Sequence, residues 1–261
     1  MTLHLGKTPH VDDPRDLKLA SYTAALPTLP PGPLGHDRTV ATDAWGMLGN
    51  GPDDTVTPGF QGAGDCVWAG GDHETILWNL ERGRKVTFTG ACAIGDYSAC
   101  TGYRIGDPST DNGTDVRTAM GYRRSKGLRD ATGRRHKITA YTALHPGDLT
   151  QIQQSLYLFG VAAIGIEFPT SAMDQFNAGK PWEVVSRSKT EGGHYVPIVY
   201  YDPTTGLYDC ITWGRRQPVT ARFLTKYMDE GYAPLTIEDQ TRGRTLEGFD
   251  LATLQQDLTR V

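Results

Sequence analysis

The sequence has few cysteines, no long apolar run and no block of one charge. Four cysteines in 261 residues do not form a dense disulfide framework, so we expect a reduced, cytoplasmic protein, with one bridge between Cys92 and Cys100 as an alternative. No apolar stretch approaches the length of a transmembrane helix. The first 16 residues lack the basic start and apolar run of a secretory signal, so none is expected.

Charge is balanced along the chain. The 26 basic and 30 acidic residues give a net charge of −4 without a long run of either sign. Binding to nucleic acid or to a membrane surface is therefore not expected, and a peptide or small-molecule partner fits better. Neither a CxxC pair nor a paired-histidine spacing occurs, so we expect no metal and no other cofactor.

Proline, apolar periodicity and turn residues divide the chain. Residues 1–40 are rich in proline and predict an extended arm that lies as a strap on the main domain. Helical spacing predicts helices over 66–83, 114–127, 148–159, 220–230 and 250–259, and apolar runs predict strands over 161–168, 194–202, 207–213 and near Leu235. We expect a main domain over 41–235 and a C-terminal extension over 236–261.

Most predicted helices precede most predicted strands, which is typical of an α+β protein rather than of an alternating parallel one. The last helix carries Leu251, Leu254 and Leu258 at helical spacing. These leucines should bury against an apolar surface, either of this chain or of another protein.

Two residues carry the expected chemistry. Cys66 stands at the first turn of a predicted helix, where unsatisfied N–H groups favour the thiolate. A nucleophile also needs a base supplied by another part of the fold. His194 begins a predicted strand after Gly192 and Gly193, which permit close approach of a substrate backbone.

Around these two residues the sequence resembles the papain-like cysteine peptidases. VTPGFQGAGDCVW (Val56 to Trp68) resembles the segment in which a Gln-Gly pair precedes the nucleophilic cysteine. DNGTDVRTAMGYRRSKGL from Asp111 resembles the substrate rim and the next helix, and GGHYVPIVYYD followed by TWG resembles the histidine and tryptophan segments. The resemblance implies a two-lobed α+β fold, a helical lobe followed by an antiparallel sheet or barrel, with a cleft between them.

The resemblance also implies roles for individual residues. Cys66 would be the nucleophile and His194 its base, while the oxyanion would lie between the Gln61 amide and the Cys66 backbone N–H. Trp213 would cover the histidine. The remaining implied substrate-binding residues are Asn112, Gly113, Gly192 and Gly193.

Two departures from the papain pattern concern these roles. Gln61 stands five residues before Cys66, one fewer than usual. The asparagine that orients the histidine is replaced by Ile211, which cannot accept a hydrogen bond. Asp209 is the first candidate to replace it because it shares a strand face with Ile211. Thr212 would need a bulge, and a Cys-His dyad without a third member is the remaining alternative.

The expected function is hydrolysis of amide bonds in a peptide, for example a peptidoglycan stem peptide. The sequence also resembles papain-like proteins of bacteria and their tailed phages, so a virion-associated location is an alternative to the cytoplasm. A second hypothesis is a weak or inactive papain-like module that binds other structural proteins through its termini. Acyl transfer by the same dyad is the third.

Overall fold

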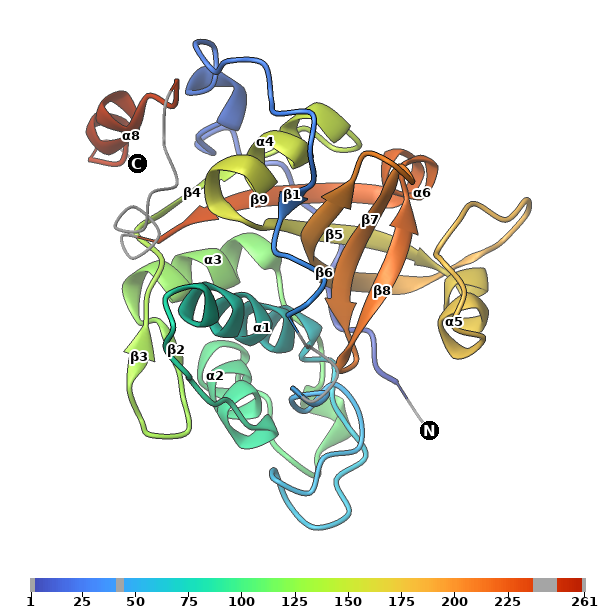
Figure 1. The fold of residues 1–261 in the computed structure, drawn as a ribbon. Helices are drawn as coiled ribbons and strands as arrows, with labels where there is room; N and C mark the ends of the chain where they lie inside the picture. Colours follow the sequence, from blue (N-terminus) through green and yellow to red (C-terminus); the bar gives the residue numbers. More distant parts are fainter. Residues whose placement is uncertain (1–2, 41–44, 237–247, 260–261) are drawn as a thin grey trace.

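The computed structural model describes residues 3–40, 45–236 and 248–259 of the chain (Figure 1). The helices are η1 Leu19–Ser21, α1 Cys66–Glu81, α2 Gly90–Thr101, η2 Pro108–Thr110, α3 Val116–Ser125, α4 Leu149–Phe159, α5 Thr170–Asn177, α6 Ala221–Tyr227 and α8 Leu251–Asp257. The strands are β1 Leu34–Gly35, β2 Leu128–Arg129, β3 Arg135–His136, β4 Ala140–Ala143, β5 Ala162–Pro169, β6 Thr190–Asp202, β7 Leu207–Thr212, β8 Arg215–Thr220 and β9 Met228–Leu235.

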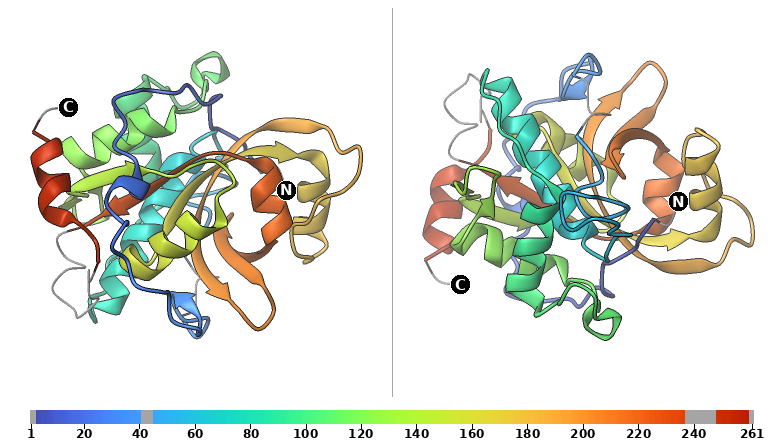
Figure 2. Two further views of the ribbon diagram at one scale, coloured as in Figure 1. Left: turned by 90° about the horizontal axis from the view of Figure 1, so that it is seen from above. Right: turned by 90° about the horizontal axis from the view of Figure 1, so that it is seen from below.

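An antiparallel sheet in the order β4-β9-β5-β6-β7-β8 forms the centre of the structure, and β1 adds to β6. One face of the sheet packs against α1, α2 and α3, while α5 and α6 lie at the other side of the sheet (Figure 2). Side chains along a strand alternate between the faces. On β6, Val196 and Ile198 therefore join the core on the α4–α6 side, while Tyr195 and Val199 join the core of the helical side.

Local signals located several elements correctly. Asp148 caps α4 by accepting from Thr150 and Gln151, and Gly160 ends it in the left-handed conformation. The helix predicted from residue 114 begins at Val116, and Asp115 caps it because its carboxylate accepts from the Thr118 N–H. The helix predicted over 220–230 ends at Tyr227, and the chain continues directly into β9.

Several elements were not expected from the sequence, and the longest of them are α2, α5 and β8. The sequence of α2, GACAIGDYSACT, is rich in small residues and glycine, and the helix packs against α1. The segment of α5 reads as a loop, and β8 contains a proline that interrupts the strand pattern. In each case tertiary packing outweighs weak local propensity.

Helix α1 is buried along most of its length and passes through the middle of the molecule. It approaches β6 closely because Gly70 faces the Tyr195 ring: a Cβ at Gly70 would lie 2.5 Å from Tyr195 Cε1. Glycine in the middle of a helix usually weakens it by about 1 kcal/mol relative to alanine. Here it lets the helix that begins at Cys66 contact the strand that contains His194.

A buried polar cluster joins α1, α3 and β6. The Glu74 carboxylate accepts a hydrogen bond from the Tyr195 hydroxyl and forms an ion pair with Arg123 at 2.6 Å. All three residues are at most 1% exposed. Because each polar group satisfies another, the cluster fixes the relative position of the three elements.

The C-terminal helix α8 packs on this chain. Leu254 is fully buried in the core on the α4–α6 side, with Leu251 and Leu258 partly buried beside it. The Asp250 N–H donates to the Tyr22 carbonyl, and the Tyr22 hydroxyl donates to Asp257 at 2.9 Å. The extension therefore lies against the N-terminal arm (Figure 1), while its residues 237–247, 260 and 261 lie outside the described part of the chain.

The structure does not form the alternative Cys92–Cys100 bridge. All four cysteines are free. Cys92 and Cys100 both lie on α2, eight residues apart, which separates them by about 12 Å along a helix axis. Among the described residues, no helix is long and apolar enough to cross a membrane.

We predict that Glu74→Gln destabilises the protein by about 3–5 kcal/mol, because it leaves the Arg123 charge buried without its partner. The urea midpoint of unfolding measures this loss. Glu183→Gln is the matched control, since Glu183 is exposed, and it should change stability by less than about 0.5 kcal/mol. Equal midpoints for the two variants would contradict the role assigned to the cluster.

Candidate active site

Cys66 is the first residue of α1 and is buried. Its sulfur accepts a hydrogen bond from the Tyr195 backbone N–H at 3.4 Å. Burial raises the pKa of the thiol to about 12, against the backbone N–H groups of Tyr195 and Gly6, which act to lower it. In this state the cysteine is therefore a protonated thiol, although its place at a helix N-terminus favours the thiolate.

His194 lies on β6 beneath Trp213. The two rings stack with centroids 4.5 Å apart and an angle of 15° between their planes, and Phe168 contacts the imidazole edge to face. The Nε2 atom lies 2.7 Å from the Thr212 hydroxyl. Among the described residues, Nδ1 has no hydrogen-bond partner. Burial lowers the pKa of His194 to about 3, so the ring is neutral.

The structure brings the predicted nucleophile and base together. Cys66 and His194 line one small cavity, of about 10 Å³, together with Asn50, Ile211 and Trp213. A cavity of this size holds about one water molecule and no substrate. If Thr212 accepts from Nε2–H, Nδ1 is left as the proton acceptor of the ring.

Thr212 takes the position expected for Asp209. The Asp209 carboxylate instead accepts hydrogen bonds from Arg38 at 2.7 and 3.0 Å. Asp209 and Ile211 share one face of β7, whereas Thr212 shares the other face with Cys210 and contacts His194 of β6. The expectation was wrong because it assumed that the strand face with Ile211 is the one turned towards His194, whereas the Thr212 hydroxyl contacts the imidazole. The sheet has a register shift between Ile198 and Tyr200, opposite this part of β7.

Gln61 does not point to the thiol in this structure. Its side-chain amide is exposed and donates to the Gly59 carbonyl at 2.9 Å. A second amide, that of Asn50, is buried in the wall of the cavity and donates to the Ala63 carbonyl at 3.0 Å. Sequence reasoning missed Asn50, which lies in a glycine-rich turn without a motif of its own.

The N-terminal arm crosses the cleft beside Cys66. The Gly6 and Lys7 N–H groups both donate to the Gly193 carbonyl, at 3.1 and 3.0 Å. On the opposite rim, the Thr8 N–H donates to the Thr114 carbonyl, and the Thr114 N–H donates to the Gly6 carbonyl at 2.7 Å. The arm is thus joined through isolated β-bridges at Lys7 to Thr114 on one rim and to Gly193 on the other.

Glycines on both sides allow this approach. A Cβ at Gly6 would lie 1.9 Å from the Gly64 carbonyl oxygen, and a Cβ at Gly193 would lie 2.2 Å from the Lys7 carbonyl oxygen. Gly113 and Gly192 likewise contact Gly6 and Leu5. Of the predicted substrate-binding residues, three glycines therefore lie against the arm. Asn112 does not share this role: its side chain is exposed, and its amide donates to the Ser109 carbonyl.

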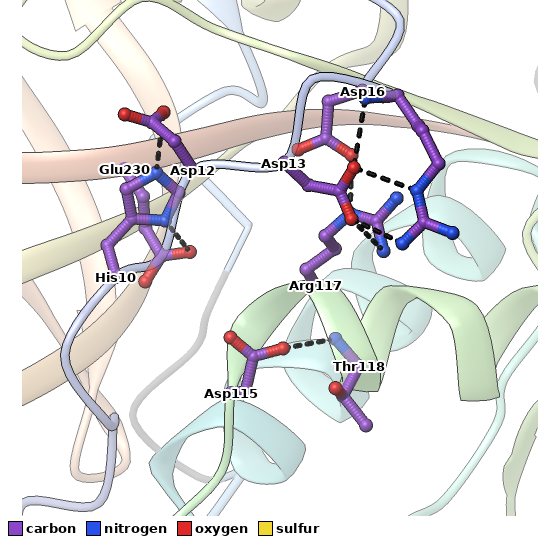
Figure 3. A network of polar contacts seen from close by, with 9 residues as sticks. His10, Asp12, Asp13, Asp16, Asp115, Arg117, Thr118 and Glu230 are labelled. Carbon is purple, nitrogen blue, oxygen red and sulfur yellow. Dashed lines mark hydrogen bonds and ion pairs between the residues drawn. The ribbon is translucent and has the colours of Figure 1, made fainter.

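Further along, the arm is held by charged residues (Figure 3). Arg117 of α3 pairs with Asp13 at 3.2 Å and with Asp16 at 2.6 Å, while His10 contacts Glu230 of β9. The sequence predicted a strap on the main domain. The structure shows that the strap occupies the cleft, a contact between distant residues for which the arm sequence has no signal.

The architecture matches solved structures of cysteine peptidases. Xylellain, a cysteine protease from Xylella fastidiosa, superposes with a TM-score of 0.67 at 13% identity over 90% of this chain and 97% of its own. The chain has a papain-like fold. No family model and no curated protein matches the sequence.

Two further structures support this fold. Digestive procathepsin L 3 of Tenebrio molitor larval midgut gives a TM-score of 0.54 at 14% identity, covering 84% of this chain and 74% of its own. A chain from a study of the mite allergens Blo t 1 and Der p 1 gives 0.53 at 12% identity, covering 89% and 75%. The papain-like fold predicted from the sequence is thereby confirmed.

We predict an acid-dependent loss of stability from His194. Its pKa is lowered to about 3 in the folded state, so the unfolded chain binds more protons between about pH 3 and pH 6.5, and stability falls as pH decreases through that window. From pH 7 to pH 5 this one group should cost about 2 kcal/mol. Urea unfolding at both pH values should show a smaller loss for His194→Gln than for the unchanged chain. Equal losses would contradict the burial of a neutral imidazole.

Proposed function

We propose that this protein is a cysteine peptidase in which Cys66 and His194 cleave peptide bonds, and that its N-terminal arm holds it closed. One observation carries the proposal: a thiol at a helix N-terminus and an imidazole with an unpartnered Nδ1 line the same cavity. The papain-like fold adds support, since xylellain is a cysteine protease. The arm lies where an extended peptide would pair with both rims.

The reaction follows from the positions of these groups. His194 Nδ1 takes the thiol proton, and the Cys66 sulfur attacks the carbonyl carbon of the scissile amide. The C–N bond breaks as the imidazolium returns a proton to the leaving amine, which leaves a thioester. Water then attacks the thioester with His194 as base, releasing the acid and restoring the thiol.

The oxyanion would be held by the Cys66 backbone N–H and the Gln61 side-chain amide. This assignment requires the Gln61 amide to turn away from the Gly59 carbonyl. Both residues are exposed, so little packing opposes that rotation. The other amide near the thiol, that of Asn50, is already bound to Ala63.

The arm acts as an inhibitor rather than as a substrate. The group of the arm that acts on the Cys66 sulfur is the Gly6 backbone N–H, which lowers the pKa of the thiol and has no electrophilic carbon to be attacked. The Gly6 carbonyl accepts a hydrogen bond from the Thr114 N–H. Burial by the packed cleft keeps the thiol protonated and the imidazole neutral. Once the arm leaves, water reaches the pair, and the cost of forming a thiolate and an imidazolium falls.

A glycine variant of the full chain tests the proposal. Gly6→Val introduces a Cβ against the Gly64 carbonyl and should expel the arm from the cleft, whereas Gly32→Val lies in the same arm with open space around it. We expect iodoacetamide to label Cys66 at pH 7 at least about tenfold faster in Gly6→Val than in Gly32→Val, because the thiol gains access and thiolate character.

Hydrolysis of a peptide library by Gly6→Val, abolished by Cys66→Ala in the same background, is the expected functional result. A Cys66 that is labelled but cleaves no peptide would favour the inactive binding module. Incorporation of an added amine in place of hydrolysis would favour the acyl transferase. If Cys66 of Gly6→Val reacts with iodoacetamide no faster than a cysteine of the unfolded chain, that result would contradict the activated pair itself.

We also predict a positioning role for Thr212. Thr212→Val keeps the shape of the side chain but removes the hydroxyl from His194 Nε2, and it should lower kcat/KM of the Gly6→Val enzyme by about tenfold, the effect of losing one buried hydrogen bond. The acidic limb of the pH–rate profile should move as well, which a purely structural change would not cause. Asp209→Asn is the comparison, and a larger effect there would favour Asp209 instead.

A further inference from the structure

The Lys7 side chain fills a buried acidic pocket beside the cleft. Its Nζ lies 2.7 Å from Asp229 Oδ2 and 2.9 Å from Glu230 Oε1, and it also donates to the Thr8 carbonyl. The Lys7 side chain is 1% exposed and that of Glu230 also 1%, while Asp229 is 20% exposed. An ammonium group is therefore enclosed by two carboxylates with little contact with water.

A bulge in β9 brings the two carboxylates together. Gly165 of β5 pairs with Glu230, and the next residue, Ile166, pairs with Met228, so Asp229 is the extra residue. Neighbours in a regular strand point to opposite faces. The bulge re-aims one of them, and both acids can therefore meet the same cation.

The neighbouring strand leaves room for a long side chain. A Cβ at Gly165 would lie 2.8 Å from Lys7 Cδ and 2.4 Å from Glu230 Cγ, so any larger residue at 165 would close the pocket. On the far side, Glu230 also lines an open cavity of about 460 Å³ with His10 and Tyr232. Figure 3 shows His10 of the arm meeting the second oxygen of Glu230.

The pocket and the catalytic pair belong to one cleft. The Lys7 N–H donates to the carbonyl of Gly193, the residue before His194, and Gly6 packs on Gly64, two residues before Cys66. A chain that replaces the arm along these same backbone groups would place one of its side chains over the pocket. Without a cation there, the nearly buried Glu230 carboxylate beside Asp229 would lose the charge that offsets its loss of hydration.

We propose that the Asp229–Glu230 pocket is a substrate subsite that selects a lysine or arginine side chain, and that Lys7 occupies it in the closed state. This inference rests on the proposed peptidase function and specifies its substrate class: peptides with a basic residue close to the cleaved bond. The arm thus holds the site through the same charge recognition that a substrate would use.

The test uses the full chain with the pocket emptied. In the double variant, Gly6→Val makes the arm clash with the cleft wall, and Lys7→Ala removes the lysine that fills the pocket. The probes are alanine-based fluorogenic peptides with a single arginine, or a single citrulline, at successive positions before the reporter amide. Citrulline keeps the shape of arginine and removes its charge. We expect arginine to exceed citrulline in kcat/KM by about 10- to 100-fold at one position only.

Adding Glu230→Gln should reduce that ratio at the same position to less than about threefold, because one buried carboxylate partner is lost. Glu167→Gln, an exposed acid on β5, should leave the ratio unchanged. The citrulline peptides report the basal reaction, and the exposed-site variant Glu167→Gln should cleave them as fast as its parent.

Cleavage of both peptide series at equal rates would overturn the subsite and leave the peptidase function standing. Arginine selectivity that survives Glu230→Gln would also overturn it. Cys66 that is neither labelled nor active in the Gly6→Val background would overturn the peptidase function, and the subsite with it. Lys7→Arg should preserve closure of the unmodified arm, whereas Lys7→Met should loosen it, as faster labelling of Cys66 will show.

Discussion

The buried contact of Glu74 with Tyr195 and Arg123 is the constraint on which the site depends. Glu74 lies on α1 eight residues after Cys66, and Tyr195 follows His194 directly on β6. A carboxylate and a guanidinium inside the protein are satisfied only in one relative arrangement of their elements. The same contact therefore sets the distance between the helix that carries the thiol and the strand that carries the imidazole.

Side chains on strand β6 alternate between the two faces of the sheet, so neighbouring residues contact Cys66 and the aromatic rings on opposite faces. Tyr195 faces α1 and gives its N–H to the Cys66 sulfur, while His194 packs among aromatic rings on the other side. Irregularities in neighbouring strands supply what a regular sheet would not. The shift near Ile198 accompanies the contact of Thr212 with His194, and the bulge at Asp229 creates the acidic pocket.

The closed state follows from how near the arm lies to the cleft walls. Glycines on the walls let the arm backbone pair with Gly193 and Thr114, and Lys7 and Arg117 add charge contacts at two points. Both catalytic candidates are buried, and burial raises the pKa of the Cys66 thiol and lowers that of the His194 imidazole. Activity, on the function proposed, is therefore governed by whether the arm occupies the cleft.

The sequence by itself determined the α+β class and the papain-like character of the fold, because helix caps, apolar periods and the segments around Cys66 and His194 are local signals. Elements such as strand β8 and helix α2 were not predicted, since their local propensity is weak and tertiary packing determines their conformation. Only the tertiary structure replaced Asp209 by Thr212, moved the arm into the cleft and joined Lys7 to Glu230. Those outcomes depend on strand register and on contacts between residues far apart in the sequence, as between Lys7 and Asp229 at a separation of 222, which no local pattern encodes.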